Sequence, residues 1–333
     1  MSETRDHVAV RIDNILVDLP CTPSKPSIFR AADDLRSMNE KLYDPKVVAI
    51  GPFHHGEDQL CKMEQHKFRY LKLLLKRKNE FSVDTYVMAI RSLEEKARKC
   101  YAEPIKFDQD ELVEMLLVDG FFIIELLRKH GIDEFRDKDD PIFQYKHILN
   151  QLRHDLFLVE NQIPSFILVQ LFSMTRTGNP DDDINYLIHL FIDDISPWPK
   201  VSEETLKLSI KNVDHLLDLL YKIFCASFAK VVSVRGMKIP GLHVSDESET
   251  LFRNLIAYEQ SFSDDHPKYV TDYAFFMHCL INSSKDVEAL RRAGIITNLL
   301  GDDEMVYHMF NRIGRNVPTS TDFCYAELFE KSE

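Results

Sequence analysis

The stretch LVEMLLVDGFFIIELL at residues 112–127 decides the fold class, because it is the strongest candidate for a membrane-spanning helix in the sequence. It carries three acidic residues, Glu114, Asp119 and Glu125. Spanning a bilayer takes about 20 largely uncharged residues. The stretch therefore predicts a long helix buried inside a globular protein rather than a membrane span.

Both ends of this helix are marked in the sequence. Asp108 and Glu111 form a capping-box pair, in which side-chain acceptors satisfy free backbone amides at a helix start. Lys129 and His130 place cations at the negative end of the helix, and Gly131 follows them.

Helical periodicity recurs on both sides of this helix, and glycine is scarce, with 10 residues. The β-branched run VVAI at 47–50 predicts a short strand, and residues 226–244 could hold one or two more. Helices are predicted near residues 10–19, 59–76, 84–100, 141–162, 164–172, 184–193, 212–225, 247–260, 268–282, 285–292 and 302–312.

These patterns predict a mainly α protein, a single large multi-helix domain with two lobes and a few short β-strands. Residues 1–27 are expected to form an N-terminal segment with a short helix, and residues 28–333 a composite α-helical domain. The lobe boundary is placed near 175–204, where the sequence has its best loops. Whether two domains separate there is left open, and the apolar helices on both sides favour one domain.

Composition excludes several classes of protein. The net charge of −13 argues against nonspecific binding to nucleic acid or to anionic membranes. The six cysteines are far apart without a CxxC pair, so neither a zinc finger nor a disulfide framework is expected. The N-terminus lacks the apolar core of a signal peptide, which predicts a soluble, cytoplasmic chain as given. The single glycosylation sequon, at Asn282, is uninformative on its own.

Short catalytic and cofactor motifs are missing from the sequence. It contains no P-loop, no dinucleotide-binding glycine pattern, no G-x-S-x-G and no H-E-x-x-H. We therefore predict no cofactor and no enzymatic activity, although active sites can also assemble from distant residues.

The loop GPFHHG at 51–56 is the most distinctive local feature. Gly51 and Gly56 permit backbone angles that other residues resist, and Pro52 stiffens the chain between them. We interpret the loop as structural: one of His54 and His55 bonds the loop backbone while the other contacts a neighbouring helix.

A metal-dependent or carboxylate-based hydrolase is the alternative interpretation of this loop. It would combine His54 and His55 with Glu64 or His66. Adjacent side chains of an extended segment point to opposite sides, so the two histidines rarely bind one ion together. The structural interpretation is therefore favoured.

Polar residues embedded in apolar sequence can likewise be interpreted as structural or as functional. They are Asp119, Glu125, Asp155, Glu160, Asn161 and Gln162. Because an unpaired buried charge is costly, the carboxylates need partners. The candidate cations are Lys67, Arg69, Arg128 and Arg153. The alternative is a carboxylate site with shifted pKa values.

Five long blocks, in order over about residues 8–330, resemble the plant family catalogued as "domain of unknown function 247". They are the stretches 28–71, 111–127, 155–168, 239–260 and 269–310. The signature positions, structural or interacting, are Gly51, Pro52, His54, His55, Gly56, Glu64, Lys67, Asp119, Gly120, Glu125, Glu160, Asn161, Gln162, Pro164, Asn254 and Glu259.

The resemblance implies a noncatalytic plant module for protein interaction, signalling or recognition, with an unknown protein partner. Some grass members of the family are associated with self-incompatibility recognition. Family members commonly end in a hydrophobic membrane segment, whereas this chain ends at FCYAELFEKSE. A membrane tether, and a membrane-associated location such as the plasma membrane, is therefore expected of a longer form. Partner contacts are expected at the loops 175–183 and 195–204.

Overall fold

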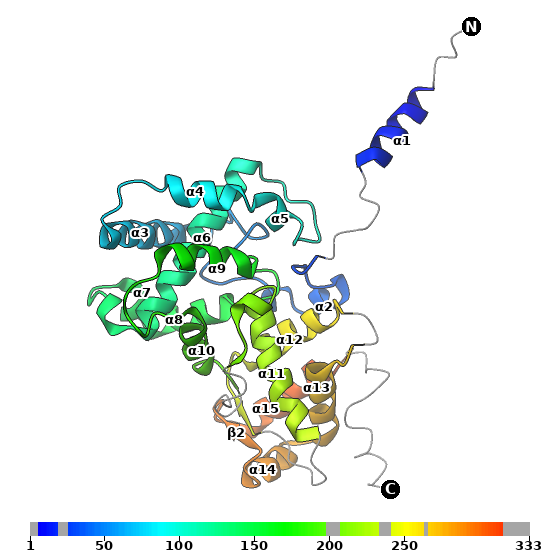
Figure 1. Cartoon of the computed structure of the whole chain (residues 1–333). Helices are drawn as coiled ribbons and strands as arrows, with labels where there is room; N and C mark the ends of the chain where they lie inside the picture. Colours follow the sequence, from blue (N-terminus) through cyan, green and yellow to red (C-terminus); the bar gives the residue numbers. More distant parts are fainter. Residues whose placement is uncertain (1–5, 19–25, 198–206, 233–240, 263–265, 316–333) are drawn as a thin grey trace.

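The computed structural model of the chain describes residues 6–18, 26–197, 207–232, 241–262 and 266–315 (Figure 1). The fold is mainly helical with short strands, as predicted. The N-terminal helices are α1 (His7–Asp18), α2 (Asp33–Met38), α3 (Cys61–Lys78), α4 (Asp84–Arg91), α5 (Glu94–Arg98), α6 (Gln109–Gly131), α7 (Pro141–Gln144), α8 (Lys146–Asp155), α9 (Ser165–Thr175) and α10 (Ile184–Asp193). The C-terminal elements are α11 (Leu216–Val232), β1 (Leu242–Val244), α12 (Ser248–Glu259), α13 (Tyr269–Leu280), α14 (Ser284–Arg292), β2 (Ile296–Asn298) and α15 (Asp303–Gly314).

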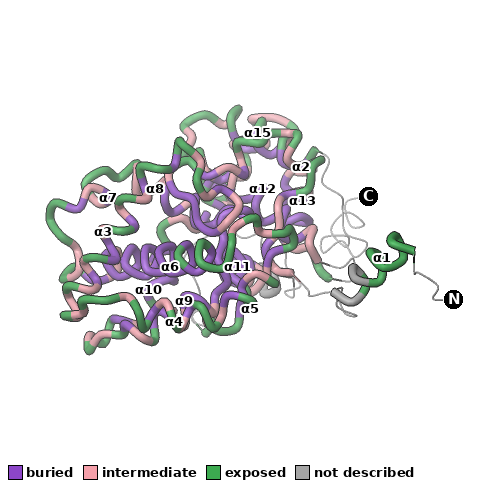
Figure 2. The backbone as a smooth tube through the Cα atoms, turned by 90° about the horizontal axis from the view of Figure 1, so that it is seen from above, coloured by how far each residue is buried: buried purple, intermediate pink, exposed green. Residues whose placement is uncertain are grey.

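Helix α6 is the axis of the N-terminal group of helices. Its predicted capping box is confirmed: Glu111 N donates to Asp108 Oδ1 (2.9 Å), and Asp108 N donates to Glu111 Oε2 (2.9 Å). Every residue from 115 to 129 is buried, and Figure 2 shows the helix purple along most of its length. Helices α3, α4, α9 and α10 pack around it.

Gly120 is the point of close approach between α6 and α9. A Cβ at this position would lie 2.5 Å from Leu171 Cδ1 and 3.6 Å from Ile167 Cγ2. The absence of a side chain therefore lets the two helices pack closely.

The C-terminal group is built on α12, α13 and α15, with α14 packed on α15. Strands β1 and β2 form a parallel pair, with Leu242 opposite Ile296 and Val244 opposite Asn298. The strand expected within 226–244 is thus present as β1, whereas residues 233–240 lie outside the described part of the chain.

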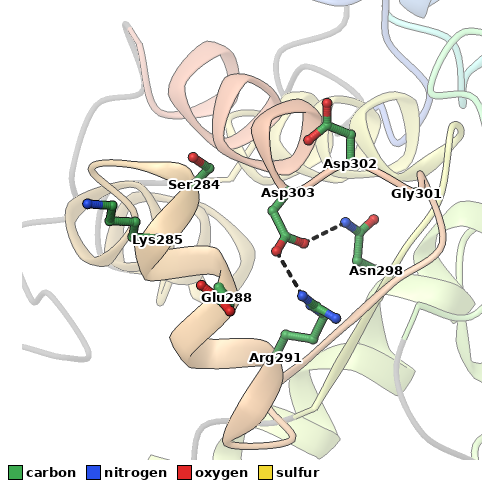
Figure 3. A pocket seen from close by; sticks show the side chains of 8 residues that line it. All are labelled: Ser284, Lys285, Glu288, Arg291, Asn298, Gly301, Asp302 and Asp303. Atoms are coloured by element: carbon green, nitrogen blue, oxygen red, sulfur yellow. Dashed lines mark hydrogen bonds and ion pairs between the residues drawn. The ribbon is translucent and has the colours of Figure 1, made fainter.

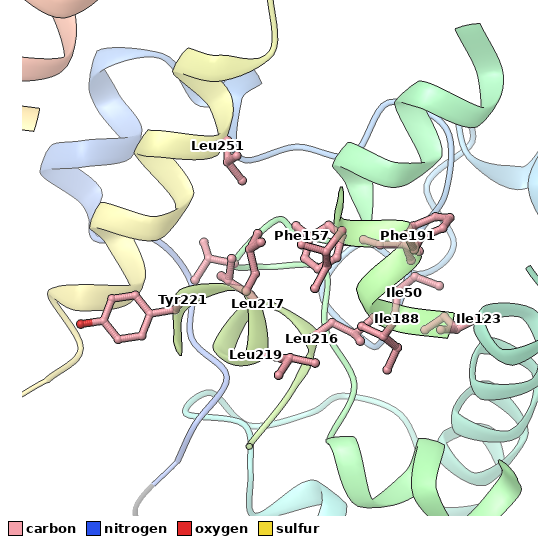
Figure 4. Close-up of a cluster of buried hydrophobic side chains, with 14 of the residues drawn as sticks. Ile50, Ile123, Phe157, Ile188, Phe191, Leu216, Leu217, Leu219, Tyr221 and Leu251 are labelled. Atoms are coloured by element: carbon pink, nitrogen blue, oxygen red, sulfur yellow. The ribbon is translucent and has the colours of Figure 1, made fainter. Parts of the chain in front are cut away.

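One buried apolar cluster joins the two groups (Figure 4). Ile123 of α6 and Phe191 of α10 gather with Leu216 of α11 and Leu251 of α12. Whether the groups fold as one domain, with a boundary near 175–204, stays a prediction.

The predicted strand at 47–50 is wrong. This segment has no regular secondary structure and pairs with no strand of the described chain. Its backbone amides donate to side chains instead: Val47 and Val48 to Asp155 (2.7 and 2.9 Å), and Ile50 to Asn161 (2.6 Å). The predicted helices 84–100 and 141–162 are also each shorter and interrupted, giving α4 with α5 and α7 with α8.

Helix α1 lies apart from the other helices in Figure 1, and its apolar side chains Val8, Ile12 and Leu16 are exposed. Among the described helices, none combines the length and apolar character needed to cross a membrane.

Candidate functional site

The glycine-framed loop after residue 50 is anchored by its backbone. Gly51 has φ +73° and Gly56 has φ +86°, so both occupy the left-handed region that favours glycine. A Cβ on Gly51 would collide with the backbone carbonyl oxygen of Gln162 and lie 3.2 Å from Tyr101 Oη. A Cβ on Gly56 would meet open space. The first glycine is therefore required by both φ and contact, the second by φ alone.

The two histidines of the loop have separate partners. His54 is buried, and its Nδ1 lies 2.8 Å from Glu57 Oε1 while its Nε2 lies 3.6 Å from Glu160 Oε2. His55 packs edge-on against Phe107, with ring centroids 5.4 Å apart. None of these contacts runs to the loop backbone. The predicted bond between one histidine and the loop backbone is therefore wrong: His54 contacts carboxylates instead.

Glu160 is the hub of this site. Its carboxylate accepts from Arg30 Nη1 (2.8 Å), Arg36 Nη1 (2.6 Å) and the Ala31 amide (3.1 Å). Burial alone would raise its pKa, but the contact with His54 and the charges of the two arginines lower it. For His54, burial acts to lower the pKa, and the two carboxylates outweigh it and raise the pKa. The hub therefore favours an ionised glutamate beside a protonated histidine.

A second buried ion pair binds the backbone at the start of the loop. Lys67 Nζ of α3 donates to Asp119 Oδ1 (2.6 Å) and to the Ala49 carbonyl (2.6 Å), and it lies 2.7 Å from Glu64 Oε1. The other oxygen of Asp119 accepts from the Gly51 amide (2.8 Å). Burial would lower the pKa of Lys67, but the two carboxylates raise it. This cation has three acceptors and no exposed surface.

The corner before α9 holds the same segment from a third direction. Asn161 Nδ2 donates to the carbonyls of Val48 (3.0 Å) and Asp155 (2.8 Å). Gln162 Nε2 donates to the carbonyls of Leu156 and Leu158, both at 2.8 Å. Pro164 then precedes the first residue of α9, as predicted.

Glu125 anchors the far end of α6. It binds Arg77 of α3 through two bonds (2.7 and 2.8 Å) and Arg128 at 3.1 Å. Arg128 also donates to Asp182 (2.8 Å) in the loop between α9 and α10. The sequence identified Lys67 and Arg128 correctly as partners of the buried acids, whereas Arg153 instead binds Asp194 (2.5 Å).

The two C-terminal signature residues also form hydrogen bonds with backbone groups. Asn254 accepts from the Val159 amide (2.9 Å) and donates to the Leu42 carbonyl (2.8 Å). Glu259 accepts from the amides of Val270 (2.8 Å) and Thr271 (2.7 Å) and so caps the start of α13.

The buried carboxylate of Glu259 should make the unfolding free energy depend on pH. Burial raises its pKa to about 7, although hydrogen bonds from Thr271 and the α13 amides oppose the shift. The folded pKa is above the unfolded value, so the folded state binds more protons between about pH 4.5 and 7. The unfolding free energy of the wild type relative to Glu259→Gln should therefore fall by about 1–3 kcal/mol as pH rises across this window.

Urea unfolding of both proteins from pH 5 to 8 measures this difference, with Glu114→Gln, an exposed carboxylate on α6, as the control. A constant difference between wild type and Glu259→Gln over the whole range would contradict the prediction.

The structure thus brings most of the N-terminal signature residues together around residues 46–56. Gly120 packs against α9 instead, and Glu125, Asn254 and Glu259 lie in separate clusters. No group of three His, Cys, Asp or Glu side chains in the described residues is placed to hold a metal ion. At the Glu160 hub, the two guanidinium groups of Arg30 and Arg36 would repel a cation. The side chains of Lys67, Asp119, Glu160 and Asn161 bond to one another, to arginines or to the backbone, whereas His54 Nε2 and His55 Nδ1 are buried without a hydrogen bond.

A surface pocket of about 440 Å³ lies elsewhere, between α14, the loop after β2 and the start of α15 (Figure 3). Asp303 points between Arg291 (3.1 Å) and Asn298 (2.8 Å) and binds both. None of the sixteen signature positions lines this pocket. Its lining residues are Ser284, Lys285, Glu288, Arg291, Asn298, Gly301, Asp302 and Asp303.

Sequence reasoning missed the partners that come from far along the chain. Arg30 and Arg36 lie in polar sequence near the start of the domain, and no local pattern relates them to Glu160. Arg77 lies in the run LKLLLKRK at 71–78, whose charges are typical of a solvated helix end. For Arg30 and Arg36, the available signal was their position inside the first block that resembles the family.

Comparison with known proteins adds the following. A family model described as "Plant protein of unknown function", DUF247, matches residues 28–234 and 226–333. The Arabidopsis thaliana "UPF0481 protein At3g47200" is 30% identical over 360 residues, which cover 90% of this chain and 74% of that protein. The "Putative UPF0481 protein At3g02645" of the same plant is 30% identical over 201 residues, covering 59% of this chain and 37% of that protein. No solved structure matches the chain.

Proposed function

The chain belongs to the plant family DUF247, and on that premise we propose that it is a noncatalytic module for protein interaction or recognition. The observation that supports this proposal most is that signature side chains are buried and bonded inside the protein. Lys67, Asp119 and Glu160 are buried and bonded, so they stabilise the scaffold and leave recognition to the surface.

The loop between α9 and α10 suits such a role, because it is anchored from within. Asp182 is buried, binds Arg128 and accepts from Thr177 N (2.7 Å). The tip residues Arg176 and Asp181 are exposed. A fixed loop with an exposed tip is the usual arrangement for recognition on a rigid scaffold. The other proposed loop, 195–204, lies partly outside the described residues.

A tip variant tests this placement. We expect Arg176→Ala/Pro180→Ser/Asp181→Ala to lose most of the protein partner that the full wild-type chain captures from plant tissue, because these substitutions remove exposed contacts and leave Asp182 in place. Quantitative mass spectrometry of the captured proteins measures the loss.

The matched control is Glu134→Ala/Lys138→Ala/Asp139→Ala, which alters three exposed residues of the segment between α6 and α7. Equal capture by the tip variant and the control would contradict the placement. Attachment of a longer form to a membrane remains part of the proposal.

A further inference from the structure

A second hollow of the C-terminal group, about 210 Å³, runs along α15 and is called the α15 groove here. It lies between α15 and the start of α12. Its lining residues are Ser245, Asp246, Glu249, Leu300, Met305, His308, Met309 and Arg312.

The apolar part of the α15 groove is open to a partner. Met305 is 48% exposed, and Leu299, next to Leu300 in the chain, is 64% exposed. Met309, one turn after Met305, is buried and supports the floor. Methionine side chains adapt their shape and are common on surfaces that bind other proteins, so this surface can receive an apolar side chain.

The charge of the α15 groove favours a cationic occupant. Its arginine, Arg312, is already bound to Glu249 through Nη2 (2.6 Å) and Nε (3.1 Å). Asp246 lines the groove, whereas Asp302, at the start of α15, lines the adjoining pocket of Figure 3. Both are exposed, and no ion pair joins either to a cation within the described part of the chain. The uncompensated negative charge of the groove itself therefore comes from Asp246, and Asp302 adds to it from the adjoining pocket.

The loop that separates the groove from the pocket of Figure 3 is held in place. Asn298 accepts from the Leu300 amide (2.8 Å) and donates to Asp303 (2.8 Å), which also binds Arg291 (3.1 Å). A surface fixed in this way loses little conformational freedom on binding.

From these observations we infer that the α15 groove docks a cationic amphipathic segment of a partner protein. An apolar side chain of the segment packs on Met305 and Leu300, and flanking lysine or arginine residues pair with Asp246 and Asp302. The inference rests on the proposed function and names the surface and the class of partner for it.

The experiment uses the full chain and a fluorescent helical peptide of leucine and lysine, with a leucine–glutamate peptide of the same spacing as the probe control. Fluorescence anisotropy should show binding of the lysine peptide that weakens with salt. Met305→Asn and Asp246→Asn/Asp302→Asn should each weaken it by about tenfold. Asparagine keeps the helix cap that Asp302 provides to Glu304 N.

Two matched controls should bind as the wild type does: Met88→Asn, at a methionine that is 71% exposed on α4, and Asp108→Asn, at the cap of α6. Equal binding by the wild type and all variants, or tighter binding of the glutamate peptide, would overturn the inference. So would groove-dependent binding of a peptide of residues 6–18 tighter than that of the lysine peptide, because it would identify the chain's own α1 as the occupant.

Failure of the docking site and failure of the proposed function give different results. If the groove variants capture a plant partner as well as the wild type does, the interaction role stands and the docking site is wrong. If the peptide binds through the groove but no partner is captured from tissue, the docking chemistry stands and the proposed function fails.

Discussion

Replacing Lys67 with methionine should lower the unfolding free energy by about 3–5 kcal/mol. The change keeps an apolar stem of similar length but removes the ammonium group that binds Asp119 (2.6 Å) and the Ala49 carbonyl (2.6 Å). The Asp119 carboxylate would remain buried with only the Gly51 amide as a partner. Urea unfolding followed by circular dichroism measures the loss.

Two further variants identify the cause. Lys67→Met/Asp119→Asn should recover part of the lost stability, because it also removes the uncompensated buried charge. Lys99→Met, which breaks the exposed pair with Glu95 (2.6 Å), should change stability little. If Lys67→Met were as mild as Lys99→Met, the buried pair would not stabilise the scaffold.

The second large effect is expected at Gly51. Gly51→Ala should cost about 2–5 kcal/mol of unfolding free energy, because it combines a strained positive φ with a collision at the Gln162 carbonyl. Gly56→Ala has a similar φ but open space around its Cβ, so about 1 kcal/mol is expected. Thermal and urea unfolding of the two variants compare them directly.

The glycine pair is its own control, because the difference between the two variants isolates the contact from the backbone strain. A loss at Gly56 equal to that at Gly51 would mean that the approach of the loop to the corner before α9 does not matter for stability.

The sequence predicted the parts of the fold that depend on local chemistry. The capping box of Asp108 and Glu111 marks the start of α6, and the acids Asp119 and Glu125 within that helix indicate buried pairs. The cations Lys67 and Arg128 were identified because charged residues in apolar sequence need partners.

Partners that depend on tertiary packing could not be predicted in the same way. The run 47–50 has the composition of a strand, yet Val47 donates to Asp155, 108 positions along the chain. Composition cannot distinguish a strand from an irregular segment whose amides bind side chains. The arginine partners of Glu160 were missed for a related reason, because they come from a polar segment more than a hundred residues earlier.

We infer that the signature side chains maintain the scaffold by binding one another and the backbone. Urea unfolding of untagged wild type and His54→Gln, each with and without a metal chelator, tests it most directly. We expect the variant to lose about 1–3 kcal/mol of unfolding free energy, because His54 is buried between Glu57 and Glu160. We also expect the chelator to change neither protein. A wild type that loses stability with chelator, together with a His54→Gln variant that does not respond, would contradict the account and support a metal site in this loop.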